Sequence, residues 1–174
     1  RLGSWLDGVF LSLDASLDTG SITLAALSKL YPYDNTLRVL KVTGAQLRAF
    51  LEHSARYYRS LDANGRAPSE GLVDASVPGY NFDILSGAEY VLDLRRPLGQ
   101  RVTTLTVNGR EVAATDSFTL ALNNYRAGGG GGFAMLSGAP VVYERDVDIR
   151  QLLIDEVRKV SAAGERLDPA RYGA

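Results

Sequence analysis

The chain has 174 residues, of which 45% are hydrophobic and 22% are charged, and its formal net charge is −1. That size and composition are typical of one globular domain with its own core, so we expect residues 1–174 to form a single domain whose core spans about residues 20–160. The near-neutral charge excludes the basic surface that gathers nucleic acid polymers, and no apolar run approaches the roughly 20 residues of a membrane span.

The first predicted elements are a short helix and a strand. Leucines spaced one turn apart predict a helix over 21–30, with Ser21 or Thr23 as its N-cap. Pro32 ends this helix, because proline fixes its own φ and pushes the preceding residue towards an extended conformation. The β-rich alternation that follows predicts a strand over 36–42.

A second helix follows this strand directly. Thr43 and Gln46 have the spacing of a capping box, in which each side chain bonds the backbone of the other residue. The apolar stripe of the helix runs from Leu47 to Tyr58. Residues 59–79 are polar and contain several Pro and Gly, which predicts a long loop of the kind that is functional or mobile in compact domains.

Short strands dominate the middle of the chain. They are predicted at 82–85, 89–94, 102–107, 111–113 and 118–122. Asn108-Gly109, between the third and fourth of them, is the strongest short hairpin signal. Asp148 is the predicted N-cap of a last helix, which ends at Gly164. The predicted buried face of that helix consists of Ile149, Leu152, Leu153, Val157 and Val160. Because strands cluster between helices, the predicted fold class is α+β, with mixed β-sheets and flanking helices.

A run of five glycines follows the sequence Asn-Asn-Tyr-Arg-Ala at 123–127. Glycine loses more backbone freedom on folding than any other residue, so the run indicates either a loose linker or a backbone that comes close to something. We favour close approach because Tyr125 and Phe133 bracket the run. The glycines are Gly128, Gly129, Gly130, Gly131 and Gly132. A ring beside such a loop suits a planar ligand such as a nucleotide, and Arg126 could meet an anion. The Gly-Lys-Ser/Thr of a P-loop is absent.

His53 is the only histidine of the chain. It lies within helical spacing, where a structural or solvated role is its expected use. A two-metal hydrolase site draws several His and Asp ligands, and a Ser-His-Asp triad needs its histidine opposite a nucleophile. The absence of cysteine also excludes thiolate metal sites. We therefore expect no catalytic residue, no metal ligand and no cofactor in this chain.

Four segments together resemble one known family. They are Tyr-Pro-Tyr-Asp-Asn-Thr-Leu at 31–37, Val-Thr-Gly-Ala-Gln-Leu at 42–47, Pro-Gly-Tyr-Asn-Phe-Asp at 78–83 and Asn-Asn-Tyr-Arg-Ala-Gly-Gly at 123–129. In order and spacing the chain resembles the C-terminal domain of the 5′-nucleotidase family, most closely its 2′,3′-cyclic-nucleotide 2′-phosphodiesterase/3′-nucleotidase branch. In that family this domain holds the nucleoside, and an N-terminal metallophosphatase domain carries two metal ions and the catalytic residues.

The resemblance implies a nucleoside site. The family clamps the base between two aromatic rings, which fall on Tyr33 and Tyr125 here, and stacking on an aromatic face is worth about 1–3 kcal/mol per base. The family's base-edge asparagine falls on Asn35, and a glycine whose backbone lies near the base falls on Gly79. Arg126 is the local candidate for a phosphate contact.

Each of these side chains also has a structural alternative. Tyr33 could be a packed turn aromatic, and Asn35 could cap a turn, the commonest use of asparagine. Arg126 could pair with a neighbouring carboxylate. Tyr80, next to the candidate glycine, is expected to be a packing residue, and Arg101 is expected to lie on a solvated rim.

Two departures from the family pattern bear on the substrate. The Asp that binds the ribose hydroxyls in 5′-nucleotidases is Gly131 here, so no carboxylate would repel a phosphate on the 2′ or 3′ oxygen. We therefore expect Gly131→Asp to weaken binding of 2′,3′-cyclic and 3′-nucleotides through its charge. The stretch Val9–Asp14 stands where the family has Gly-Gly-Gly-Ile-Arg, so the family's phosphate-binding arginine has no counterpart.

The resulting hypothesis is the substrate-binding and specificity domain of a two-domain, metal-dependent nucleotide phosphohydrolase, either a 2′,3′-cyclic-nucleotide 2′-phosphodiesterase/3′-nucleotidase or a 5′-nucleotidase. The chain opens without Met, so we expect a fragment of a longer protein whose N-terminal domain supplies a divalent metal pair. By resemblance such enzymes are periplasmic, cell-wall-bound or extracellular. The alternative is a stand-alone nucleoside-binding or structural module without hydrolase activity. An Asp-x-His and Asn-His-Glu pattern upstream of Arg1 would favour the enzyme.

Overall fold

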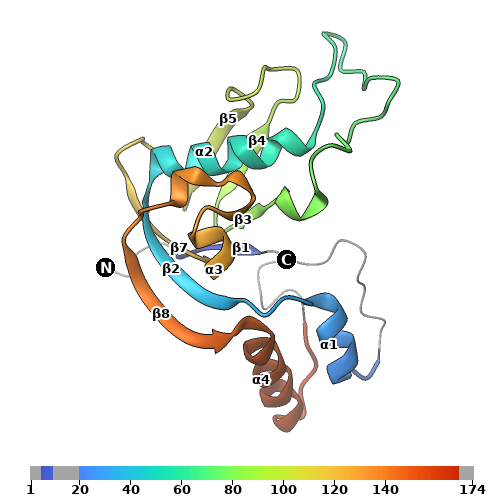
Figure 1. Cartoon of the computed structure of the whole chain (residues 1–174), viewed down its shortest axis with the longest axis vertical. Coiled ribbons are helices and arrows are strands. Elements are labelled where there is room, and N and C mark those ends of the chain that lie inside the picture. The colour runs from blue at the N-terminus through green and yellow to red at the C-terminus, as the bar shows by residue number, and fades with distance from the viewer. Residues whose placement is uncertain (1–4, 10–19, 169–174) are drawn as a thin grey trace.

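The computed structural model describes residues 5–9 and 20–168. Its helices are α1 (Leu24–Leu30), α2 (Gly44–Ser54), α3 (Asn124–Ala127) and α4 (Ile149–Ala162). Its strands are β1 (Trp5–Val9), β2 (Thr36–Thr43), β3 (Ile84–Ser86), β4 (Glu89–Leu92), β5 (Val102–Val107), β6 (Arg110–Glu111), β7 (Ser117–Asn123) and β8 (Val141–Asp148). Neighbouring strands are antiparallel except for β1 and β7, and helices flank the sheets, which is an α+β arrangement (Figure 1).

The strands form two sheets. Five belong to a mixed sheet in the order β3-β1-β7-β2-β8, in which β1 and β7 are parallel and the other neighbours are antiparallel. The other three form an antiparallel sheet in the order β4-β5-β6. Its β5–β6 hairpin turns at Asn108 (φ 52°) and Gly109 (φ 72°), the two positive φ values that the Asn-Gly signal predicts.

The helix α2 packs its apolar face into the core between the two sheets (Figure 1). Thr43 and Gln46 begin the helix with both bonds of the predicted capping box. The helix ends at Ser54, earlier than its apolar stripe predicts. Tyr58 lies beyond the helix and forms a β-bridge with Val73, which holds the start of the long loop.

Arg101 holds the segment that follows α2. Its side chain is buried, and its Nη1 donates to the carbonyls of Ala55 and Tyr58, at 2.6 Å each, while Nη2 donates to Ser60 Oγ at 2.9 Å. Both carbonyls lie just beyond the end of α2, so this buried cation stabilises the path of the chain as it leaves the helix. The expected solvated rim position of Arg101 was therefore wrong.

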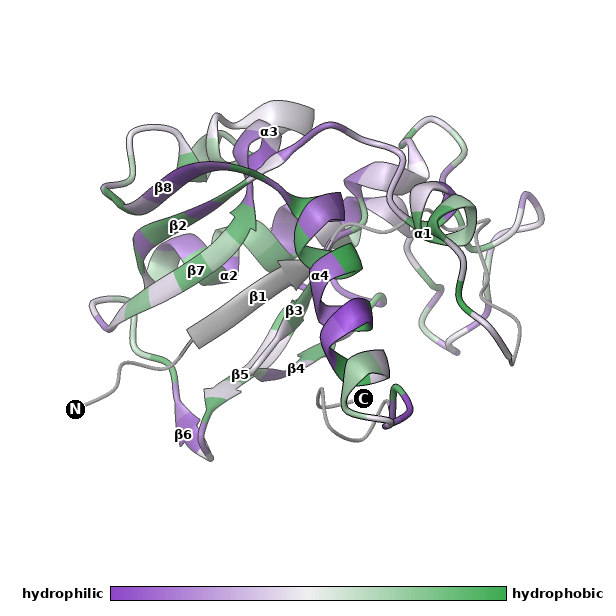
Figure 2. Ribbon diagram, turned by 90° about the horizontal axis from the view of Figure 1, so that it is seen from below, coloured by the Kyte–Doolittle hydropathy of each residue, from purple (hydrophilic) through white to green (hydrophobic). Residues whose placement is uncertain are grey.

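The helices α1 and α4 pack against each other on the side of the sheet away from α2 (Figures 1 and 2). Asp148 is the N-cap of α4, as predicted, and accepts from Arg150 N at 2.7 Å. Of the predicted buried face of α4, however, Val160 alone is fully buried, and Leu152 is 39% exposed. The helix lies at the edge of the fold against α1 and β8, so its apolar stripe is covered in part.

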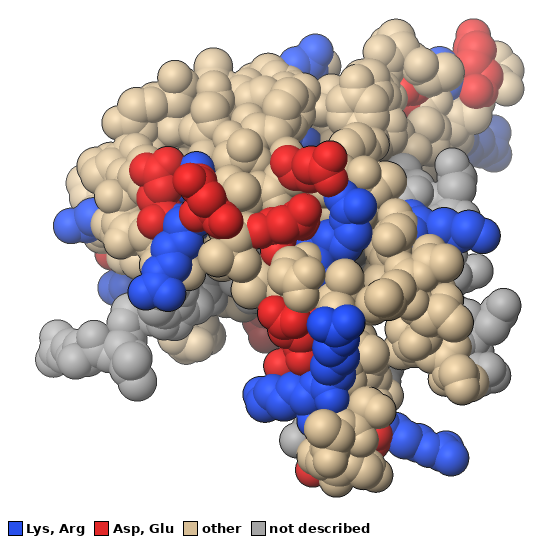
Figure 3. Space-filling view, turned by 60° about the horizontal axis from the view of Figure 1, so that its bottom comes forward, with Lys and Arg blue, Asp and Glu red and all other residues tan. Residues whose placement is uncertain are grey.

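The strand β8, which no sequence signal predicted, forms one edge of the five-stranded sheet. From the neighbouring strand, Arg38 pairs with Glu144 at 2.8 Å and with Asp146 at 3.6 Å. Figure 3 shows acidic and basic side chains beside each other on this face, rather than a field of one sign. Within the part of the chain that the structure describes, no helix has the length and apolar character to cross a membrane.

Candidate functional site

Two segments that carry predicted site residues meet where β2 begins and β7 ends. The strands pair antiparallel, with Leu37 opposite Asn123. Asn124 Oδ1 accepts a hydrogen bond from Thr36 N at 3.1 Å, which extends the connection beyond the strands. The turn before β2 and the short helix α3 therefore lie at the same end of the sheet, although they are far apart in sequence.

Tyr33 and Tyr125 both lie on the surface at this end, with 41% and 48% of their area exposed. Tyr33 contacts the buried ring of Tyr31 in a T-shaped pair, with 6.2 Å between ring centroids. The ring of Tyr125 lies against the backbone of Gly130, where a Cβ would be 2.6 Å from Cδ2 and Cε2. Each ring is thus supported by the protein and still accessible, as a platform for a planar ligand must be. That the two rings face each other across a base stays a prediction.

Asn35 and Gly79 border the same region. Asn35 Nδ2 donates to Tyr31 Oη at 3.3 Å, and its side-chain oxygen has no partner among residues 5–9 and 20–168. Gly79 opens a single 3₁₀ turn, and the carbonyl of the next residue, Tyr80, accepts from Arg126 Nη2 at 2.8 Å. Tyr80 is 45% exposed, so its packing role stays a prediction.

Arg126 is buried, with 1% of its surface exposed. It forms a bidentate ion pair with Asp83, from Nε to Oδ2 at 2.6 Å and from Nη2 to Oδ1 at 2.9 Å. It also donates to Gly130 O at 2.6 Å, Tyr80 O at 2.8 Å and Asn81 Oδ1 at 3.5 Å. These bonds engage every N–H group of the guanidinium. Arg126 therefore has the carboxylate partner of the alternative interpretation, and its contact with an anionic ligand stays a prediction.

The glycine run packs around side chains of the chain itself. A Cβ at Gly131 (φ +71°) would overlap Asn81 Oδ1 and Arg126 Nη1. A Cβ at Gly132 (φ +85°) would lie 3.0 Å from His53 Cε1. Glycine is required at both positions by its positive φ and by this crowding. The backbone does approach other groups closely, as the run predicts, but at these glycines the groups are the protein's own.

This crowding changes what a side chain at Gly131 could do. The Cβ direction there points towards Arg126 inside the loop, so an aspartate would disrupt the loop before its charge reached a ligand. The expected charge effect of Gly131→Asp is therefore corrected to a steric one. Gly128 is different, because its φ is −78° and the nearest atom to a Cβ would be 3.6 Å away. The stretch 10–14, where the family carries its phosphate-binding arginine, lies outside the described residues.

His53 supports the glycine run from α2. Its Nε2 lies 3.0 Å from Gly131 O, and its Nδ1 lies 3.4 Å from Arg56 Nη1. Because a carbonyl can only accept and a guanidinium can only donate, the neutral tautomer with its proton on Nε2 satisfies both contacts. The ring packs edge-on against Phe133, with 4.4 Å between centroids. This is the structural role that the sequence predicts for the histidine.

The pKa of His53 predicts a pH dependence of stability. Burial lowers this pKa, the bond to Gly131 opposes the change, and the nearby cations Arg56 and Arg126 lower it further, whereas Asp83 raises it. The unfolded histidine therefore takes up a proton at a higher pH than the folded one. Its contribution to stability is complete above the unfolded pKa of about 6.5 and is lost as the pH falls towards the folded value. Urea unfolding between about pH 5 and pH 8 should show this slope in the wild type and a flatter one in His53→Gln. An equal slope in the variant would assign the dependence to another group.

This end of the molecule offers two aromatic faces, a side-chain amide and backbone carbonyls. Such groups bind and orient a neutral planar ligand with hydrogen-bonding edges. In residues 5–9 and 20–168, no three His, Asp or Glu side chains gather in a way that could hold a metal ion. That the described residues at this end bind such a ligand stays a prediction.

Comparison with known proteins places this arrangement in context. Residues 9–138 match the family model described as the 5′-nucleotidase C-terminal domain. The chain is 32% identical over 166 residues to the 2′,3′-cyclic-nucleotide 2′-phosphodiesterase/3′-nucleotidase of Haemophilus influenzae, a match that covers 88% of this chain and 25% of the relative. It is 28% identical over 165 residues to the trifunctional nucleotide phosphoesterase protein YfkN of Bacillus subtilis, covering 88% of this chain and 11% of that protein.

A solved structure shows the same fold. The chain superposes with a TM-score of 0.79 and 34% identity on a Staphylococcus aureus protein assigned as a 5′-nucleotidase and crystallised with alpha-ketoglutarate. The match covers 88% of this chain and 30% of that one. The chain therefore spans a quarter or less of the two curated relatives and under a third of the solved protein.

Proposed function

The chain belongs to the 5′-nucleotidase C-terminal domain family, and we propose that it is the nucleoside-binding and specificity domain of a two-domain, metal-dependent nucleotide phosphohydrolase. The observation that carries the proposal is the pair of exposed, supported tyrosines, Tyr33 and Tyr125, at the ends of neighbouring strands. The base would insert between the rings, and the unpartnered side-chain oxygen of Asn35 would accept from an amino group on its edge. Gly79 would line the site with its backbone.

The substrate class follows from what the described residues lack. No carboxylate occupies position 131, and none fits there, so a nucleoside with phosphate on its 2′ or 3′ oxygen meets no fixed negative charge from the glycine run. This supports 2′,3′-cyclic and 3′-nucleotides over 5′-nucleotides as preferred substrates. The similarity to the Haemophilus influenzae enzyme points the same way.

In this proposal the described residues bind and orient the nucleoside, and another part of the full-length protein performs hydrolysis. A divalent metal pair held by an N-terminal metallophosphatase domain would supply the Lewis acid and the activated water. We accordingly expect this chain alone to hydrolyse neither 2′,3′-cyclic AMP nor 3′-AMP in excess Mn²⁺. Export to the periplasm, cell wall or medium belongs to the same proposal.

Substitution of the two tyrosines tests the proposal in the full-length protein. Tyr33→Ala and Tyr125→Ala should each raise KM for 2′,3′-cyclic AMP by the equivalent of about 1–3 kcal/mol, because a stacking face is lost. Phenylalanine at either position should restore KM, since the ring is kept. Tyr143→Ala on β8 is the matched control and should leave KM unchanged.

The alternative is a nucleoside-binding or structural module without hydrolase activity. It would be supported if the full-length protein bound adenosine but turned over no nucleotide with Mn²⁺ present. Unchanged adenosine affinity in both alanine variants would instead show that the tyrosines do not form the base site.

A further inference from the structure

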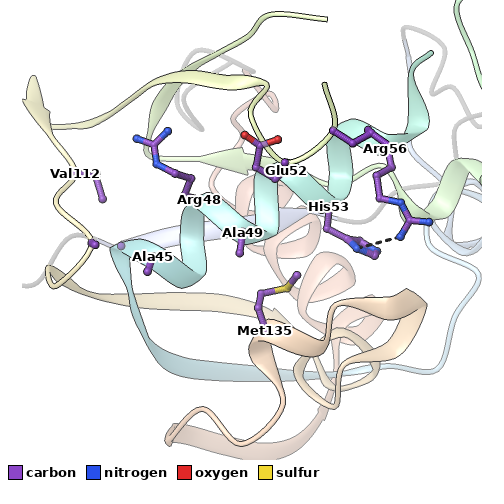
Figure 4. Close-up of a pocket in the computed structure, with 12 residues that line it drawn as sticks. Ala45, Arg48, Ala49, Glu52, His53, Arg56, Val112 and Met135 are labelled. Carbon is purple, nitrogen blue, oxygen red and sulfur yellow. Dashed lines mark hydrogen bonds between the residues drawn. The ribbon is translucent and has the colours of Figure 1, made fainter. Parts of the chain in front are cut away.

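A groove runs along the solvent side of α2 (Figure 4). Its volume is about 540 Å³, within the range of small-molecule sites, and none of the candidate nucleoside-binding residues lines it. Its floor is one face of α2 and of the 3₁₀ turn that follows it (Ala55–Tyr57), made by residues three and four apart. These residues are Ala45, Arg48, Ala49, Glu52, His53 and Arg56.

The groove has apolar walls, and small side chains line the middle of its floor. Val112 stands at one end of it, and Met135 flanks α2 on the side opposite Arg48 (Figure 4). Leu98, in the β4–β5 turn, is exposed and contributes a further apolar wall. Ala49 occupies the middle of the floor, so an apolar or aromatic body could lie directly on the helix.

Two arginines are held in place at the groove. Arg48 Nη1 donates to Val102 O at 2.6 Å, and Arg56 Nη1 lies within 3.4 Å of His53 Nδ1. In the part of the chain that the structure describes, neither guanidinium has a carboxylate partner, and their Nε and Nη2 groups make no further bond. Eight residues separate them, or about 12 Å along a helix, so each serves a different end of the groove. An anchored guanidinium loses less conformational freedom when it binds an anion.

The one carboxylate among the lining residues does not neutralise them. Glu52 accepts hydrogen bonds from Arg101 N at 3.0 Å and from Val102 N at 2.7 Å, so both its oxygens are directed to the backbone of β5 and the turn before it. Two cations and one engaged carboxylate leave the groove with a positive charge. Its lining thus combines apolar walls with donors suited to a planar anion.

We propose that this groove is a second binding site, which takes an amphiphilic organic anion. The apolar body of the ligand lies on Ala49 between Val112 and Met135, and its carboxylate, sulfonate or phosphate group pairs with Arg56. The site is separate from the proposed nucleoside site, so its occupation does not depend on that function.

Fluorescence titration of the full-length protein tests the proposal, with 1-anilinonaphthalene-8-sulfonate as the probe and adenosine present at saturation. We expect one probe per chain and a Kd that rises about fivefold in Arg56→Gln, because an exposed ion pair is lost. Ala49→Leu should raise the Kd about tenfold or more by filling the floor. Arg66→Gln, an exposed arginine of the long loop, is the matched control and should change nothing.

A neutral analogue separates charge from apolar contact. N-phenyl-1-naphthylamine has the same ring system without the sulfonate, so it should bind the wild type more weakly and be indifferent to Arg56→Gln. Circular dichroism would verify that each variant is folded. The proposal is wrong if adenosine displaces the probe, or if Arg56→Gln and Ala49→Leu both bind it as the wild type does. It is equally wrong if the full-length protein does not bind the probe, since the rest of the protein would then cover the groove.

Discussion

Replacing Arg126 by methionine is expected to destabilise the protein by about 3–5 kcal/mol, because it leaves a buried carboxylate without its partner. Burial raises the pKa of Asp83, and Arg126 is the main group that opposes this rise. The same substitution removes the donors that hold Tyr80 O and Gly130 O, so the glycine run and the turn at Gly79 lose their connection. Urea unfolding followed by circular dichroism measures the loss.

Two further variants identify the cause. Asp83→Asn in the Arg126→Met background should recover part of the stability, because the unpaired buried charge is then gone. Arg110→Met removes a cation that is 73% exposed and lies 3.4 Å from Asp116, and it should cost less than about 1 kcal/mol. Equal losses of unfolding free energy from Arg126→Met and Arg110→Met would show that the buried ion pair contributes no more to stability than the exposed one.

Replacing Gly131 by alanine is expected to lower the free energy of unfolding by about 2–4 kcal/mol. Part of this loss comes from forcing a residue with a Cβ into a left-handed backbone conformation, and the rest comes from overpacking. The methyl group would overlap Asn81 Oδ1 and Arg126 Nη1, so Arg126 must shift to admit it. Because Tyr125 precedes Arg126 directly, KM for 2′,3′-cyclic AMP in the full-length protein should rise as well. Urea unfolding and steady-state kinetics on the same variant measure both effects.

The glycine run contains its own control. Gly128 has a negative φ and open space around a Cβ, so Gly128→Ala should be neutral or should stabilise the protein by about 0.4–1 kcal/mol. The gain would come from the lower conformational entropy of the unfolded chain. Asparagine and aspartate at position 131 should act as alanine does, since the loss is steric. A much larger effect of Asp than of Asn on phosphorylated ligands would restore the charge-based account and contradict the steric one.

Helix starts and the tight hairpin were predictable because their signals are local. The capping box of Thr43 and Gln46, the cap at Asp148 and the Asn108-Gly109 turn each depend on residues within a few positions of one another. Backbone donors at a helix start and the positive φ of a type I′ turn restrict the residue choice strongly. The clustering of strands between helices predicted the α+β class, and the resemblance added the family; the comparisons confirm both.

Burial of cations was not predictable in this way. Arginine is mostly exposed, so the sequence indicates surface positions for Arg126 and Arg101, and two of their partners, Asp83 and Ala55, are 43 and 46 residues away in sequence. The run of glycines does not indicate which groups lie against it, because Asn81 and His53 belong to other segments of the sequence. The strand β8 lacked a signal because its exposed edge position tolerates the charged residues that it carries. The roles of Tyr33, Asn35, Tyr125 and Gly79 in ligand binding stay predictions.

The position of β1 has a consequence for the order of folding. This strand lies between β3 and β7, with Trp5 opposite Thr119 and Val9 opposite Ile84, so its parallel pair with β7 joins segments that are far apart in sequence. Pairing of such distant strands closes a long loop, and the chain loses the entropy of that loop before the new contacts can compensate for it. We therefore expect this pairing to form late. Asp83 immediately precedes β3, and β3 pairs with β1. Asp83 should thus be fixed opposite Arg126 only after β1 has paired with β3. If β1 pairs late in folding, we expect the ion pair between Asp83 and Arg126 beside the glycine run to reach its final geometry only then.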